Sequence, residues 1–174
     1  MTIRKILTEP DPFLRQKSEK VDIVDDSIRS LMDDMLDTMY DAPGIGLAAI
    51  QIGIPKRVIV IDLSKNDEKK NPMYFVNPEI ITKSKNDASY EEGCLSVPNQ
   101  FAEISRPDKC KVKFLDYNSN EKILEAEGLL ATCIQHEMDH LEGILFIDYL
   151  SKLKKNMIIK KLSKQKKTLE RIVV

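Results

Sequence analysis

The feature that most constrains this chain of 174 residues is the spacing of its only two histidines, His136 and His140, with Glu137 between them. Four residues of α-helix turn about 400°, so both imidazoles would lie on one face, one turn apart. Such a pair can bind one metal ion, while the glutamate, offset around the helix, can reach a water beside that ion. The motif needs an apolar helix, and residues 129–134 supply one.

A helix that carries two histidines by chance is the simpler interpretation, but histidine is scarce here and both copies lie in the motif. A catalytic metal site needs a third protein ligand and an open position. A metzincin protease would place a third histidine at position 146, which is Phe146, so that subclass is excluded. Without another histidine, the third ligand must be a Cys, Asp or Glu.

Geometry alone leaves this third ligand open among the cysteines. Cys133 shares the helix face with the two histidines, but its short side chain lies a turn further back. Cys110 falls in a strand pattern, where a buried free thiol is common. Cys94 lies in EEGCLSVP, residues 91–98, which we expect to form a tight loop that can aim a thiolate. Three cysteines are an odd number, which disfavours a disulfide framework and suggests a reducing compartment.

The composition indicates one soluble domain. Hydrophobic residues make up 42% of the chain, and no apolar run approaches the roughly 18 residues of a membrane span. No signal-peptide pattern opens the chain, so we expect a cytoplasmic protein. The charge is uneven, because residues 151–174 hold eight Lys and one Arg against one Glu. The formal net charge of this segment is +8 and that of residues 1–150 is −9, so the basic tail needs an explanation.

Helical periodicity predicts three helices. The first runs over Ser27–Asp41, with Asp26 or Ser27 as its cap. The second begins at Gly128, contains the two histidines and stops near Gly143. The third is lysine-rich and starts at Ser151, and its expected apolar side consists of Leu150, Leu153, Met157, Ile158 and Leu162.

Strand patterns occupy the middle of the chain. We expect a buried strand over Arg57–Leu63 and two short strands around Asn77-Pro78 within Met73–Ser84. Two further strands, over Lys109–Asp116 and Lys122–Ala126, should pair across a turn. Strands and helices that fall in separate runs favour an α+β fold over a doubly wound sheet.

Three motifs together resemble those of the peptide deformylases: GIGLAAIQ at residues 44–51, EGCLS at 92–96 and QHEMDH at 135–140. Their order and spacing also fit. DPFLR at 11–15 resembles that family's opening segment, so the similarity extends from residue 3 to about residue 160. A single HExxH is only moderately specific, whereas three motifs in order are far more so.

The resemblance implies a single catalytic domain over residues 1–174, with a basic C-terminal helix from about residue 151. In its α+β fold, antiparallel strands surround a central metal-binding helix. It also implies a hydrolase that removes the formyl group from formyl-methionyl nascent polypeptides and releases formate. By similarity the metal ligands are Cys94, His136 and His140, and the ion is Fe2+, which Ni2+, Co2+ or Zn2+ can replace. Donor softness alone would favour Zn2+.

Catalytic roles follow from the same resemblance. Glu137 would act as general base, and the side-chain amide of Gln51 and the backbone N–H of Leu95 would donate to the oxyanion. The substrate would lie as an added strand near Gly46 and Gly93. Its methionine side chain would enter a slot lined by Glu92, Leu95, Leu129, Cys133 and His136. Glu92 would also pair with Arg106, although two adjacent glutamates alone more often form a solvated charged pair.

Several alternatives remain at this stage. Position 101 carries Phe101, where many bacterial deformylases have Arg, so a charged contact from this segment to the far end of the peptide is in doubt. The basic helix can be a solvated surface, or it can contact ribosomal RNA, as in some deformylases. An endopeptidase and a ribosome-docked binding module without catalysis are the competing functions. We expect a monomer.

Overall fold

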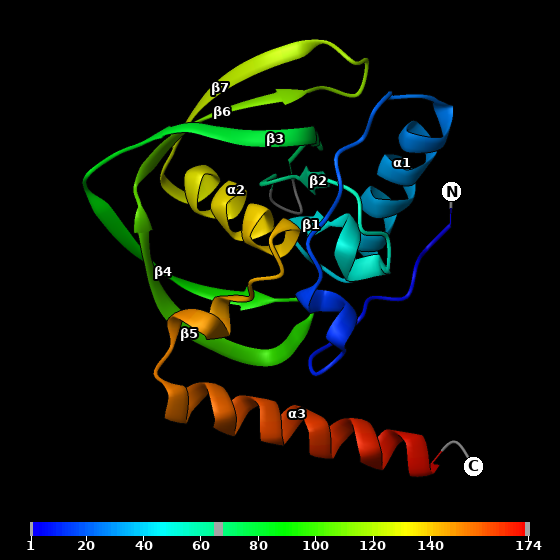
Figure 1. The fold of residues 1–174 in the computed structure, drawn as a ribbon, viewed down its shortest axis with the longest axis vertical. Coiled ribbons are helices and arrows are strands. Elements are labelled where there is room, and N and C mark those ends of the chain that lie inside the picture. The colour runs from blue at the N-terminus through cyan, green and yellow to red at the C-terminus, as the bar shows by residue number, and fades with distance from the viewer. Residues whose placement is uncertain (1, 65–67, 173–174) are drawn as a thin grey trace.

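The computed structural model describes residues 2–64 and 68–172, which form two antiparallel sheets with a helix between them (Figure 1). A five-stranded sheet has the order β1-β2-β3-β6-β7, and β4 and β5 form a separate two-stranded sheet. The α+β prediction is therefore confirmed. The strands are β1 (Gly46–Ala48), β2 (Val58–Ile61), β3 (Met73–Lys83), β4 (Asp87–Cys94), β5 (Val97–Pro107), β6 (Lys109–Leu115) and β7 (Glu121–Glu127).

Helix α2 (Gly128–Leu141) is the predicted central helix and packs against both sheets. Its bounds agree with the sequence prediction, since the helix begins at Gly128 and ends two residues before Gly143. Both glycines have a left-handed backbone, with φ +60° at Gly128 and φ +74° at Gly143. The left-handed backbone at Gly143 suits glycine, and a side chain there would also collide with the carbonyl of Arg15. Apolar residues of α2 join β2, β3 and β6 in one core cluster, which includes Ile134, Leu141, Ile59, Phe75 and Val112.

Helix α1 (Asp26–Asp41) lies against β1 and β2. Its methionine-rich stripe is buried as predicted, and Met32, Met35 and Met39 are completely inaccessible to solvent. The predicted cap is wrong by one residue, because Asp25 is the N-cap and its Oδ1 accepts from the Ile28 N–H at 3.0 Å. The reason is positional, since only the residue before the first helical turn can reach that N–H.

Strand β3 corrects the prediction of two short strands. It is one strand with shifts of register near Asn77, which has φ +51°. The Asn77 side chain accepts from the Val21 N–H and donates to the Val21 carbonyl, both at 2.8 Å. The Asn-Pro pair therefore forms a β-bulge held from outside the sheet and does not end the strand.

The segment predicted as a tight loop over residues 91–98 is instead the end of a hairpin. Strands β4 and β5 pair from Asp87 opposite Pro107 to Cys94 opposite Val97. The alternation of more buried Ala88 and Tyr90 with exposed polar neighbours is interrupted at the buried, charged Glu92 and at Gly93, so the hydrophobic signal of the strand is short. Cys94 consequently stands at the end of a paired strand, which fixes it more firmly than a loop would.

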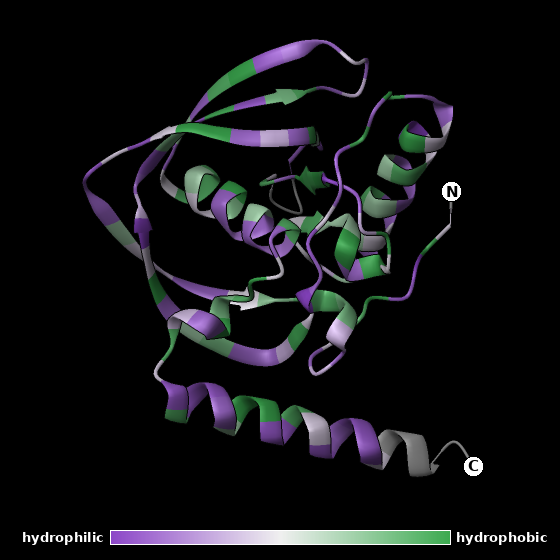
Figure 2. Ribbon diagram, in the orientation of Figure 1, coloured by the Kyte–Doolittle hydropathy of each residue, from purple (hydrophilic) through white to green (hydrophobic). Residues whose placement is uncertain are grey.

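Helix α3 (Lys152–Ile172) crosses the lower edge of the molecule in Figure 1, next to the short helix η3 (Phe146–Tyr149). Ile158, Ile159 and Leu162 join the cluster beneath it. The apolar side predicted for this helix is partly wrong, because Leu153 and Met157 are 72% and 63% exposed. A helix docked along one edge buries only a narrow stripe, and Figure 2 shows hydrophilic and hydrophobic bands along it.

In the part of the chain that the structure describes, no helix has the length and apolar character needed to cross a membrane.

Candidate metal centre

Three side chains bring their ligand atoms to one point, Cys94 from the end of β4 and His136 and His140 from α2. These atoms lie within 4.8 Å of one another, and Cys94 Sγ is 3.3 Å from His140 Nε2. Both histidines are buried, and Cys94 is partly buried. The structure therefore brings together the three residues predicted as ligands.

The donor set fits a divalent transition metal, since one sulfur and two imidazole nitrogens are borderline-soft ligands of the kind that Zn2+ and Fe2+ accept. The other two thiols are placed differently. Burial raises the pKa of the Cys133 thiol well above its ordinary value, and Cys133 Sγ lies 3.9 Å from the Ile45 carbonyl oxygen. Burial also raises the pKa of Cys110, which lies on β6. A thiol that stays protonated is a poor metal ligand.

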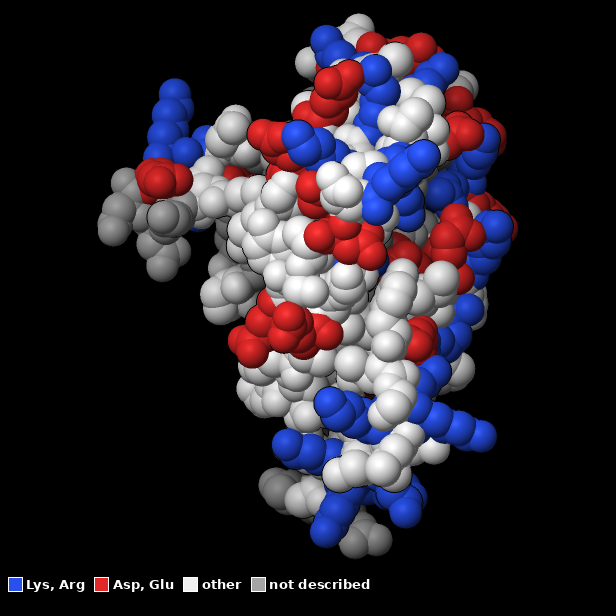
Figure 3. Space-filling model, turned by 90° about the vertical axis from the view of Figure 1, so that its left-hand side faces the viewer, with Lys and Arg blue, Asp and Glu red and all other residues white. Residues whose placement is uncertain are grey.

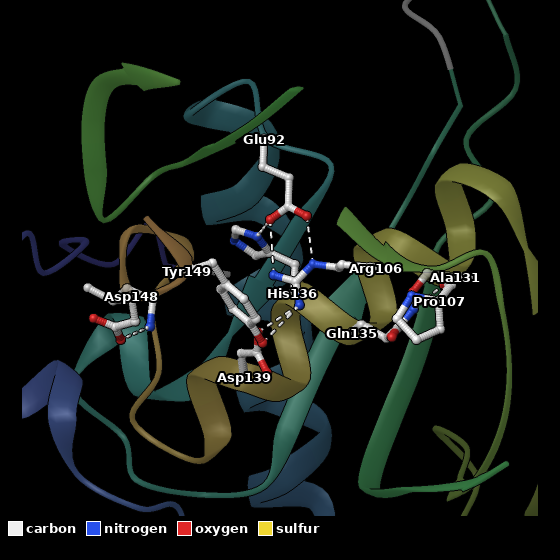
Figure 4. Close-up of polar contacts among 10 residues, drawn as sticks. Glu92, Arg106, Pro107, Ala131, Gln135, His136, Asp139, Asp148 and Tyr149 are labelled. Carbon is white, nitrogen blue, oxygen red and sulfur yellow. Dashed lines mark hydrogen bonds and ion pairs between the residues drawn. The ribbon is translucent and has the colours of Figure 1, made fainter. Parts of the chain in front are cut away.

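A buried ion-pair network orients His136 (Figure 4). Its Nδ1 lies 2.8 Å from Glu92 Oε2, which leaves Nε2 for a metal. Arg106 donates to both carboxylate oxygens of Glu92, from Nε at 2.6 Å and from Nη2 at 3.0 Å. The same guanidinium donates from Nη1 to Asp139 at 2.7 Å, and the Tyr149 hydroxyl donates to the same Asp139 oxygen at 2.8 Å.

The network extends the sequence prediction. The expected pair of Glu92 and Arg106 is present, and Glu92 also contacts a candidate ligand directly. Sequence reasoning missed Asp139 and Tyr149. The position of Asp139, three residues after His136 on the same helix, was a usable signal, because residues at i and i+3 are neighbours. Nothing local in the sequence indicates that Tyr149 folds back onto this helix.

Glu137 lies beside the cluster and is 4% exposed, and its Oε2 has no hydrogen-bond partner among the described residues. Burial raises its pKa to about 7. A carboxylate with this pKa can take up and release a proton near neutral pH, which suits a general base. The close approach depends on Gly46, because a methyl group added there would overlap Glu137 Oε1.

Gln51 is held in one orientation beside Cys94. Its Oε1 accepts from the Ala48 N–H at 2.8 Å. Its Nε2 donates to Ser96 Oγ at 3.0 Å and lies 3.5 Å from Cys94 Sγ. The amide N–H₂ group therefore faces the metal cluster, while Leu95, next to Cys94, lines the adjoining cavity.

A cavity of about 440 Å³ opens beside these residues. This volume lies within the range of about 300–1,000 Å³ that is usual for small-ligand sites. Among the residues that the sequence assigned to substrate binding, its wall contains Gly46, Glu92, Gly93, Leu129 and Cys133. His136 and Glu137 also line it, so a bound molecule would touch the candidate catalytic groups.

Phe101 lies at the rim of this cavity, opposite Gly93 in the β4–β5 hairpin. Its ring covers the glycine so closely that a Cβ there would be 2.6 Å from the ring. The side chain is 66% exposed. The cavity rim therefore has an apolar ring, and no charge, at position 101.

Comparison with known proteins decides the family. Residues 3–156 match the family model described as polypeptide deformylase. The chain belongs to the peptide deformylase family. The peptide deformylase of Pelagibacter ubique (strain HTCC1062) is 67% identical over 174 residues and covers both chains completely. The Cys94–His136–His140 cluster is the Cys/His/His metal site typical of deformylases.

Solved deformylase structures agree with the fold. The crystal structure of peptide deformylase from Ehrlichia chaffeensis has a TM-score of 0.91 and 44% identity, covering 96% of this chain and 98% of that one. The structure of the peptide deformylase from the same organism in complex with actinonin has a TM-score of 0.91 and 45% identity. It covers 95% of this chain and 98% of that one.

Replacement of each cysteine by serine tests the third ligand. We expect Cys94→Ser to lose most of its metal, because a hydroxyl is a poor substitute for a thiolate on Fe2+ or Zn2+. Cys133→Ser and Cys110→Ser should keep theirs and serve as matched controls. Metal content of the three purified proteins gives the answer. An empty Cys133→Ser variant beside a loaded Cys94→Ser variant would show that the wrong cysteine has been assigned.

Proposed function

We propose that this chain is a metal-dependent hydrolase that removes the N-terminal formyl group from formyl-methionyl nascent polypeptides and releases formate. The proposal is carried by the convergence of the Cys94–His136–His140 cluster and the buried Glu137 on one cavity. We further propose that residues 1–174 form one catalytic domain, which acts as a monomer in the cytoplasm.

A metal held by Cys94, His136 and His140 would acidify a water and polarise the formyl carbonyl. The protein's own contribution is proton transfer by Glu137. Its carboxylate would take a proton from the attacking water and later give it to the departing amine. The raised pKa from burial favours both steps, because the group is then a stronger base and can also hold the proton for a time.

Gln51 and Leu95 would stabilise the negative charge that develops on the formyl oxygen. The Gln51 side chain is already held in place by Ala48 and Ser96, and the N–H that lies near Cys94 Sγ would exchange this weak acceptor for the oxyanion. The backbone N–H of Leu95, next to the ligand Cys94, would be the second donor.

The peptide would add as a strand beside β4, with backbone contacts near Gly46 and Gly93. Its first side chain would enter the slot formed by Glu92, Leu129 and Cys133, which lies against His136. Exclusion of water from this cavity would strengthen the electrostatic interactions around the reacting amide.

The formate assay separates this activity from its alternatives. Formyl-Met-Ala-Ser incubated with the metal-loaded protein should yield formate and free Met-Ala-Ser. An endopeptidase would cleave the unformylated peptide internally, and a binding module would release nothing. Glu137 is buried and its Oε2 has no partner among the described residues, which favours a catalytic role over simple binding.

Glu137→Gln isolates the proton-transfer step. The amide keeps the shape of the side chain but cannot act as a base, so we expect a loss of about 10²-fold or more in turnover of formyl-Met-Ala-Ser. Metal content should stay unchanged, because Glu137 is not in the ligand cluster. Near-normal turnover by the metal-loaded variant would exclude Glu137 as the base.

We propose Fe2+ as the metal in the cell, with Ni2+, Co2+ or Zn2+ able to replace it. Support comes from the family and from the mixed sulfur and nitrogen donors. Ferrous iron beside a partly accessible thiolate such as Cys94 is exposed to oxidation of either partner.

Exposure to air tests this assignment. The protein isolated with its native metal should lose activity in air, more slowly with catalase and a reductant, and Ni2+ or Co2+ should restore most of it. Activity before and after each treatment, with metal analysis, gives the comparison. An iron-loaded protein that stays fully active after days in air would contradict the proposal.

We also propose that α3 docks on ribosomal RNA. Seven lysines of this helix are exposed, and Figure 3 shows Lys and Arg side chains gathered at that end of the molecule. Lys155 differs from the others, because its Nζ pairs with Asp148 at 2.6 Å and fastens the helix to η3. The free lysines are available for phosphates, whose binding weakens steeply with salt. They are Lys152, Lys154, Lys160, Lys161, Lys164, Lys166 and Lys167.

Substitution is a cleaner test than truncation, because removal of α3 would expose the core around Leu162. The triple variant Lys160→Ala, Lys161→Ala, Lys164→Ala should co-sediment with ribosomes at least several-fold less than wild type at low salt. A control variant with Lys109, Lys111 and Lys113 changed to Ala loses the same charge on β6. Equal ribosome binding by the two triple variants would mean that α3 is only a solvated surface.

A further inference from the structure

One side chain in the wall of the cavity has a polar group with no assigned task. Thr132 lies on the face of α2 that forms the slot, between Leu129 and His136 at spacings of three and four residues. It is 4% exposed. Its Oγ1 has no hydrogen-bond partner among the residues that the structure describes.

A helical threonine usually has a partner within its own helix, because its hydroxyl can donate to the carbonyl four residues earlier. Thr38 in α1 donates to the Asp34 carbonyl at 2.6 Å, and Thr168 in α3 donates to the Lys164 carbonyl at 3.0 Å. Thr132 makes no such bond to Gly128. A buried donor without a partner is unfavourable, so its presence in a ligand cavity points to a partner on the ligand.

The surroundings specify the kind of partner. Leu129, one turn earlier on α2, and Cys133, the next residue along it, offer an apolar side chain and a thiol that burial keeps protonated. On this stretch of α2 the hydroxyl of Thr132 is thus the strong donor, while Gln100, whose Nε2 also has no partner among the described residues, lines the cavity from β5. A threonine in a helix has two accessible χ1 rotamers, so its hydroxyl can turn toward a bound molecule without movement of the backbone.

We infer that Thr132 is a specificity-determining residue whose hydroxyl donates to an acceptor atom at the end of the substrate's first side chain. The inference rests on the proposed function. The thioether sulfur of methionine is a weak acceptor. A sulfoxide oxygen is a stronger one, so the slot accepts formyl-peptides that begin with methionine sulfoxide as well as methionine. Norleucine, which has the same shape but no acceptor, is turned over less well.

Thr132→Val tests this, because valine keeps the branched shape and removes only the hydroxyl. We would measure kcat/KM for formyl-Met-Ala-Ser, formyl-norleucyl-Ala-Ser and formyl-methionine-sulfoxide-Ala-Ser with both proteins. Wild type should prefer methionine to norleucine by about two- to tenfold, the scale of one net hydrogen bond. The variant should lose this preference, and its relative rate on the sulfoxide peptide should fall by about tenfold.

Ser18→Ala is the matched control. Ser18 is also buried and its Oγ also lacks a partner among the described residues, but it does not line the cavity. Its substitution should leave all three ratios unchanged.

The outcomes distinguish the two proposals. If wild type releases no formate from any of the three peptides, the proposed function falls, and this inference falls with it. If wild type and Thr132→Val cleave all three peptides with the same relative rates, or if Ser18→Ala changes the ratios as Thr132→Val does, only the role of Thr132 is overturned.

Discussion

The buried guanidinium of Arg106 is the interaction on which the site depends. Strands β4 and β5 share no ladder with the five-stranded sheet among the described residues, so side chains must fix their place against α2. Arg106, from β5, pairs with Glu92 on β4 and Asp139 on α2. Loss of one partner from such a buried group is strongly destabilising, by about 3–5 kcal/mol, because a charge is left uncompensated. The strand that carries Cys94 and the helix that carries both histidines are thereby held by the same cation.

Much of the central helix was predictable, because its information is local. The spacing of His136 and His140, the apolar residues before them and the glycines at 128 and 143 all act within a few turns. The sequence also predicted strands β2, β6 and β7, because a strand that is buried on one or both faces has a recognisable pattern of apolar residues. The family motifs added the choice of Cys94 and the role of Gln51, which periodicity could not supply.

What the sequence alone could not reveal depends on contacts between distant residues. The β4–β5 hairpin was hidden because charged residues such as Glu92 and Arg106 interrupt its apolar alternation and are satisfied by contacts between residues distant in the sequence. Tyr149 reaches Asp139 only after the chain has turned through η3. The exposure of Leu153 and Met157 follows from the place where α3 meets η3, which the pattern of the helix does not encode.

Because Gly46 has no side chain, the main chain at this position has a consequence for inhibitor design. The main chain there passes so close to Glu137 that no other residue fits without displacing the carboxylate. A compound anchored to the backbone of Gly46, and not to an exposed side chain such as Phe101, would contact a position where any added side chain must move Glu137. A substitution there that weakened the compound would therefore also disturb the group proposed as the general base.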